Sequence, residues 1–210
     1  MGGVGGSDPM DCHALEAMQC MVERRKSGET GVRAVQLIDG DAVWQAGDAG
    51  RWSWELLESA LSRSDSPRGL SEEDGRTQDL IGSGELRRLT EKPAAYCIEY
   101  NDGFRATLRM LNGAIQSYCF AARLLGQPDP VSTQFLLPPI PNVTYAACLV
   151  AKIEEMWVTG RAPYPAERTL LVSGTLESCL KSRHAGGTRL ETPHLAVSYA
   201  PPSTSQHARE

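Results

Sequence analysis

The stretch AAYCIEYNDGFRATLRMLNGAIQSYCFAARL, residues 94–124, decides the fold. It contains three runs of apolar and β-prone residues, separated by Asn101-Asp102-Gly103 and by Asn112-Gly113. Asp-Gly and Asn-Gly pairs accept the positive φ angles that tight hairpin turns require. The stretch therefore predicts a three-stranded antiparallel meander.

Hydrophobic periodicity and turn residues predict further elements on both sides of this meander. In chain order they are a helix over about 11–26, a strand, a tight turn at Asp39-Gly40 and a second short strand within 31–47, helices over 52–64 and 84–92, an extended segment in 131–139, a helix from a cap at Asn142 to Gly160, a helix over 166–184, and a strand within 189–199.

Antiparallel hairpins with helices grouped around them indicate an α+β fold, here an open antiparallel sheet with helices packed on one face. We expect a single α+β domain over residues 11–199 with a surface loop at about 65–78. The glycine-rich residues 1–10 are expected to be a flexible leader and residues 200–210 a disordered tail.

Composition narrows the classes of function. The net charge is −5, and no cluster of Lys and Arg forms the basic face that nucleic-acid binding requires. No apolar run is long enough to span a membrane. The six cysteines are widely scattered and follow no signal peptide, which is typical of reduced thiols. We therefore expect a cytoplasmic protein that binds neither nucleic acid nor membrane.

The stretch MDCHALEAMQCMVERRK, residues 10–26, carries the candidate site residues. His13 and Glu16 are three residues apart and share one helix face, and Cys20 follows one turn later. Three interpretations stay open: a metal site at these residues, a catalytic or substrate-facing histidine, and a hydrogen-bonded polar residue at a helix start. A zinc site usually adds a second ligand cluster, and none accompanies the other histidines. We therefore predict no metal site.

The order of motifs resembles the carboxy-terminal domain of the glucose–fructose oxidoreductase and inositol dehydrogenase family (Gfo/Idh/MocA type). A glycine-rich segment leads into a helix that opens with a histidine, as in GVGGSDPMDCHALEAMQCM. A hairpin follows, as in IEYNDGFRATLRMLNG, and near the end a helix, a G-x-x-P break and a second helix. The resemblance covers most of residues 5–197.

The resemblance implies reversible hydride transfer between NAD or NADP and a sugar- or polyol-like hydroxyl or carbonyl substrate. His13 would be the catalytic proton donor or acceptor, and Glu16 and Asp11 would face the substrate. The family often has an aspartate four residues before the histidine, and Pro9 stands there in this chain. Glu91-Lys92-Pro93 repeats the letters of the family's catalytic motif but lies downstream of His13, so it is predicted to be a loop entering a strand.

The glycine-rich start does not fit a dinucleotide fingerprint, which needs a preceding strand. We therefore expect no residue of this chain to bind the cofactor. A separate chain with a Rossmann domain is a possible partner, and the chain alone is expected to be inactive. The resemblance also implies a homo-oligomer formed through the sheet. The alternative is a non-catalytic binding or assembly module that keeps the fold and dimerises through its sheet.

Overall fold

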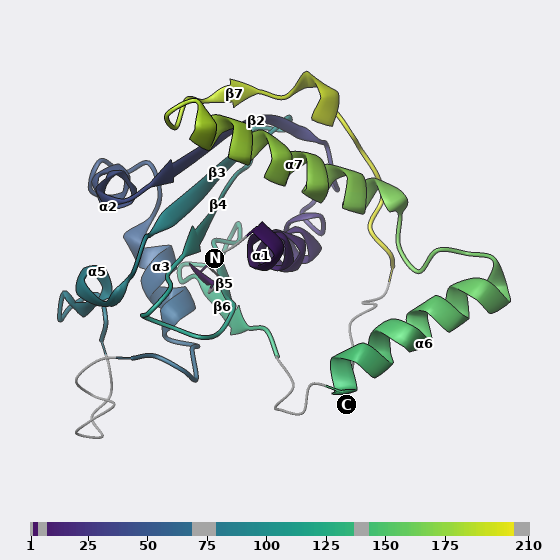
Figure 1. Cartoon of the computed structure of the whole chain (residues 1–210), viewed down its shortest axis with the longest axis horizontal. Helices are drawn as coiled ribbons and strands as arrows, with labels where there is room; N and C mark the ends of the chain where they lie inside the picture. The colour runs from purple at the N-terminus through teal and green to yellow at the C-terminus, as the bar shows by residue number, and fades with distance from the viewer. Residues whose placement is uncertain (1, 4–7, 69–78, 137–142, 204–210) are drawn as a thin grey trace.

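The computed structural model describes residues 2–3, 8–68, 79–136 and 143–203, and shows helices on both sides of one sheet (Figure 1). The strands are β1 (Gly2–Gly3), β2 (Val32–Asp39), β3 (Ala94–Tyr100), β4 (Arg105–Met110), β5 (Cys119–Ala122), β6 (Val131–Gln134) and β7 (Leu190–Glu191). The helices are α1 (Asp8–Val22), α2 (Asp41–Asp48), α3 (Trp54–Leu61), α5 (Glu85–Leu89), α6 (Val143–Thr159), α7 (Ala166–His184) and the short 3-10 helix η1 (Pro193–Leu195). The predicted α+β class with an open antiparallel sheet is confirmed, whereas the helices pack on both faces of the sheet and not on one as predicted, because two separate apolar cores form.

The spatial order of the strands is β6-β5-β1-β4-β3-β2-β7. Strands β4, β3, β2 and β7 pair antiparallel, and β5 and β6 form a second antiparallel pair. The two-residue β1 lies between these parts, parallel to β4 and antiparallel to β5. The sheet is therefore a four-stranded antiparallel unit extended by a short hairpin.

The β3–β4 hairpin confirms the first half of the predicted meander. The amide of Tyr100 donates to the carbonyl of Phe104 at 2.9 Å, and Gly103 takes a φ of 84° in the turn. The Asp102 carboxylate accepts a hydrogen bond from the Phe104 amide at 3.1 Å, which holds the turn in place. The Asn-Asp-Gly sequence thus forms the tight turn that its residues favour.

The second half of the meander was wrong in its pairing. Strand β5 exists, but it pairs with β6 and β1 instead of β4. The chain between β4 and β5 folds into a buried turn in which Ala114 and Ile115 are fully enclosed. Burying these side chains moves β5 away from β4 and leaves space for Gly2–Gly3.

The predicted second short strand after Asp39-Gly40 was also wrong, because residues 41–48 form helix α2. Gly40, with a φ of 60°, turns the chain out of β2. Val43, Trp44 and Gly47 then fall on one buried side at helical spacing. In so short a segment, the same pattern of apolar and polar residues fits a strand and a helix equally well.

Helices α1 and α7 cover one face of the sheet, which we call the inner face (Figure 1). Even-numbered residues of β3, including Tyr96 and Ile98, point into this core. Glu23, just after α1, is fully buried and is bound by Arg168 of α7 through two hydrogen bonds of 2.9 and 2.5 Å. A buried, charge-assisted pair therefore joins the two helices.

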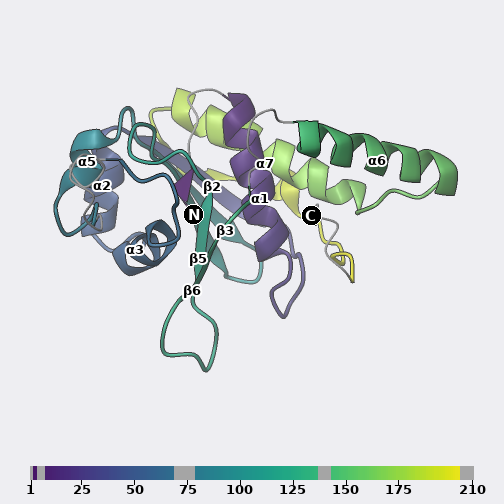
Figure 2. The same cartoon turned by 90° about the horizontal axis from the view of Figure 1, so that it is seen from below.

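Helices α2, α3 and α5 pack against one end of the opposite, outer face (Figure 2). Their core contains Trp44, Trp52 and Leu57, together with Ile38 and Ala95 from the sheet. The rest of the outer face, on β2, β3 and β4, is not covered by a helix among the described residues. This uncovered part forms the groove described below.

Helix α6 extends away from the body, as both views show (Figures 1 and 2). Its large apolar side chains are exposed, with Leu149 at 60%, Trp157 at 83% and Val158 at 87% of their possible accessible area. The predicted helix and its end at Gly160 are confirmed, while its predicted cap at Asn142 lies outside the described residues. Helix α7 has the predicted bounds, and the final strand shortens to β7 followed by η1.

Candidate functional site

The candidate catalytic residue His13 lies on the solvent-facing side of α1, where its side chain is exposed. It makes no hydrogen bond or ion pair with another described residue. An exposed imidazole is free to meet a substrate or a partner from solvent. Its proposed catalytic role stays a prediction.

Of the two candidate substrate-facing residues, Asp11 is turned into the core and Glu16 is half-buried. Asp11 is buried, with 5% exposure, and accepts a hydrogen bond from the hydroxyl of Tyr96 in β3. Burial and this hydrogen bond raise the pKa of Tyr96, so the hydroxyl stays protonated. Glu16 is half-buried; burial raises the pKa of its carboxyl group, Arg168 opposes the rise, and Glu23 adds to it. The structure thus places Asp11 in the core, away from the exposed His13, while Glu16 stays partly accessible.

The described residues contain no group of three His, Cys, Asp or Glu side chains placed to hold a metal ion. Cys20, the third member of the metal interpretation, is buried, and burial raises the pKa of its thiol to about 11. All six cysteines are unpaired.

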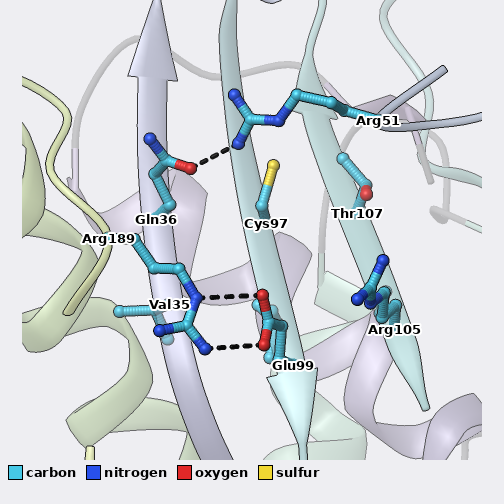
Figure 3. A pocket seen from close by; sticks show the side chains of 10 residues that line it. Val35, Gln36, Arg51, Cys97, Glu99, Arg105, Thr107 and Arg189 are labelled. Atoms are coloured by element: carbon cyan, nitrogen blue, oxygen red, sulfur yellow. Dashed lines mark hydrogen bonds and ion pairs between the residues drawn. The ribbon is translucent and has the colours of Figure 1, made fainter. Parts of the chain in front are cut away.

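The open part of the outer face contains a groove of about 280 Å³ (Figure 3). Strand alternation builds it, because every second residue of β2, β3 and β4 points to this face. Gln36, Cys97 and Thr107 form one row across the three strands, and Glu99 and Arg105 pair in the next row. Arg51 and Arg189 reach the groove from the loops before α3 and β7.

The electrostatics of the groove are dominated by guanidinium groups. Three arginines and one glutamate line it. Arg189 holds Glu99 through hydrogen bonds of 3.0 and 2.7 Å, and Arg33 adds a third of 2.7 Å. These bonds, those of Arg189 above all, lower the pKa of Glu99 to about 2. Because Glu99 is already saturated by arginines, the groove keeps an excess of positive charge.

The groove has the chemistry of a binding site more than that of a nucleophilic centre. Burial raises the pKa of the Cys97 thiol, which Arg51 and Arg109 only partly oppose, so the thiol stays protonated. No histidine lines the groove, and its one carboxylate is held by arginines. Polar donors without a base favour recognition of a polar or anionic molecule.

The groove and His13 lie on opposite sides of the sheet. Helix α1 packs on the inner face, and the groove opens on the outer one. The predicted site residues and the observed cavity therefore do not form one site. The sequence carried a signal for the groove, because Arg105 and Thr107 alternate with the inward-facing residues of β4. Arg51 and Arg189 come from distant loops and carried no such signal.

Comparison of the chain with protein-family models, with curated proteins and with solved structures gave no match in any of the three. Among the described helices, none is both long enough and apolar enough to cross a bilayer.

Proposed function

We propose that the chain is the substrate-binding and oligomerisation domain of an oxidoreductase of the glucose–fructose oxidoreductase and inositol dehydrogenase type. The order of elements supports the proposal: a histidine-bearing first helix, an Asn-Asp-Gly hairpin and two late helices surround one open antiparallel sheet. The observation that carries it is the exposure of His13 on α1.

In this proposal a sugar- or polyol-like substrate lies beside α1, where the imidazole of His13 gives or takes the proton on the substrate oxygen. Hydride transfer needs NAD or NADP, which supplies the redox chemistry. We expect the cofactor to be held by a nucleotide-binding part outside the described residues, and the chain alone to be inactive.

The experiment that tests this proposal measures binding to the purified chain. A panel of neutral sugars and polyols is screened by thermal shift, and NAD and NADP are titrated by calorimetry. We expect at least one panel member to raise the melting temperature, His13→Ala to abolish that rise, and neither nucleotide to bind saturably at micromolar concentration. His184→Ala, which removes an exposed imidazole at the end of α7, is the matched control. An equal rise in melting temperature for the unsubstituted chain and for His13→Ala contradicts the proposal.

A second candidate is a non-catalytic assembly module that dimerises through the outer face of its sheet. The position of the groove favours it, because the open face of β2, β3 and β4 is separated from His13 by the sheet. Sedimentation equilibrium tests it. We expect a dimer that Thr107→Glu on the outer face dissociates, and a chain that stays monomeric at every concentration contradicts this candidate.

A further inference from the structure

A buried guanidinium lies next to the groove. Arg109 of β4 points to the same outer face as Arg105 and Thr107, opposite Ala95 in the register. Arg109 is 3% exposed, and its Nε and Nη1 atoms are buried without a hydrogen-bond partner. No described carboxylate pairs with it. Unpaired buried charges are rare in proteins, because removing a charge from water is costly.

The Arg109 side chain is held in this position by Trp52. The guanidinium lies 4.4 Å from the centre of the Trp52 ring, a cation–π contact. Trp52 is fixed in turn, because its Nε1 donates to the carbonyl of Val43 at 3.0 Å. Gly47 lies against the ring so closely that an added Cβ would be 2.4 Å from Trp52 Cζ2. The packing of Trp52 therefore fixes the Arg109 guanidinium in its buried position, although no carboxylate pairs with it.

The simplest competing explanation is that the aromatic ring alone compensates Arg109. Burial lowers the pKa of Arg109 to about 10, so the group still carries its charge at neutral pH. The ring covers one side of the guanidinium and offers no acceptor for the in-plane N–H groups. The hydrogen-bonding capacity of Nε and Nη1 stays unused, which the ring does not explain.

Other guanidinium groups surround the same place. Arg51 and Arg109 both act on the Cys97 thiol and so lie on the same side of β3. Among the described residues, the Arg51 side chain is hydrogen-bonded only to the neutral Gln36, and the Arg105 side chain has no hydrogen bond or ion pair. Positive charge is thus concentrated around Cys97 in a chain whose net charge is −5. In Figure 3, Arg51 lies above Cys97 and Thr107, and Arg105 lies below Thr107 on the same strand.

We infer that this groove binds a small molecule through an oxyanion, a carboxylate or phosphate group, which lies by Cys97 and Thr107 and is held by Arg51 and Arg105, while the unpaired charge of Arg109 behind the groove attracts the anion. Guanidinium groups are the preferred partners of both oxyanions. A volume of about 280 Å³ suits a small ligand. The inference goes beyond the proposed function, because the groove faces away from His13 and no step of the redox proposal uses it.

Titration of the full chain with sodium phosphate and with sodium malonate tests the inference, with sodium chloride at equal ionic strength as the reference. We expect at least one of the two oxyanions to bind saturably and to raise the melting temperature, while chloride does not. The tighter of the two assigns the ligand group as phosphate or carboxylate. If both oxyanions act no differently from chloride, the inference is overturned.

Three variants locate the binding. Arg109→Met removes the buried charge and keeps most of the volume, so we expect the free protein to melt at the same or a higher temperature while oxyanion affinity falls about tenfold or more. Arg105→Gln changes an exposed residue, so folding is kept and affinity falls. Arg161→Gln removes an exposed charge in the loop after α6 and should leave affinity unchanged.

Oxyanion binding that survives both Arg105→Gln and Arg109→Met unchanged would place the ligand elsewhere and overturn the inference. A dimer that dissociates on Arg109→Met would assign a carboxylate of a second copy as the partner of Arg109, and this too would overturn it. Neither result bears on the sugar and polyol panel, so the two proposals can fail separately.

Discussion

Lys92 has a φ of 46°, a conformation that residues with a Cβ atom rarely adopt. It stands directly before the buried Pro93 at the entry to β3, where the predicted loop is found. The strain is local, and the exposed Lys92 side chain makes no hydrogen bond or ion pair with a described residue.

We predict that Lys92→Gly raises the free energy of unfolding by about 0.5–1 kcal/mol, because glycine adopts this backbone conformation without a steric cost. Urea denaturation measures the change. Lys181→Gly, in the last turn of α7, is the control and should lower the same quantity by up to about 1 kcal/mol. If Lys92→Gly also destabilises the protein, the strain at Lys92 does not exist.

Glu99 makes the stability of the outer face depend on pH. Hydrogen bonds from Arg189 and Arg33 lower its pKa from the ordinary 4.5 to about 2. The folded protein therefore binds this proton less readily than the unfolded chain does. The contribution of Glu99 to stability is complete above pH 4.5 and is lost as the pH falls toward 2.

Accordingly, the original protein should be more stable than Glu99→Gln at pH 7, and the difference should shrink between pH 4.5 and pH 2.5. Denaturant titrations at several pH values measure it. Glu58→Gln, which alters an exposed carboxylate on α3, should show a smaller and flatter difference. A difference for Glu99→Gln that grows on acidification would contradict the assigned pKa.

At the scale of elements, the strongest link between α1 and α7 is the pair formed by Glu23 and Arg168. The Glu23 side chain is completely buried and that of Arg168 is 7% exposed. Tyr199 also donates to Glu23 at 2.7 Å, so the carboxylate is bound from the carboxy-terminal segment as well. Losing one partner leaves a buried charge without compensation.

Arg168→Met should therefore lower the free energy of unfolding by about 3–5 kcal/mol. Glu23→Leu combined with Arg168→Met should recover a large part of that loss, because both charges are then absent. Equal stability of the single and the double variant would show that packing at Arg168 matters more than its charge. Chemical denaturation followed by circular dichroism decides between the two.

The elements differ in how far the sequence reveals them. Helix α7 matched its predicted bounds because Pro165 before it and Gly186 after it mark both ends. The β3–β4 hairpin matched because Asn-Asp-Gly specifies a turn locally. Helix α2 and the partners of β5 were missed, since tertiary packing against Trp52 and Ile115 decided them and no local signal does.

The candidate site was predicted less completely than the fold. His13 was placed on the first helix correctly, yet the groove lies across the sheet from it. The groove joins side chains that are more than a hundred residues apart, such as Arg51 and Arg189, so sequence spacing does not reveal it. Arg109 is the clearest missed signal: an arginine inside a strand whose neighbours are apolar.

The whole molecule consists of a packed body and one projecting helix. Most described side chains of α6 are exposed, including Ile153 and Trp157, whereas α7 buries Leu171, Val172 and Cys179. Local opening of a helix costs less when few of its contacts are lost. Helix α6 should thus be the least protected of the long helices.

We predict that amide hydrogens of α6 exchange at least ten times faster than those of the middle of α7, as measured by hydrogen–deuterium exchange of the isolated protein. Helix α7 serves as the internal standard because both come from the same sample. Equal protection of the two helices would show that another surface covers α6 in solution.

Successive side chains of β3 point to opposite faces of the sheet, so the even-numbered and odd-numbered residues contact different parts of the protein. Even positions such as Tyr96 and Ile98 are constrained by the inner core, and odd positions such as Cys97 and Glu99 border the groove. A substitution library at Cys97 can therefore change the lining of the groove while the inner core is kept. The odd position Ala95 is different, because it is fully buried in the second core with Trp44 and Trp52.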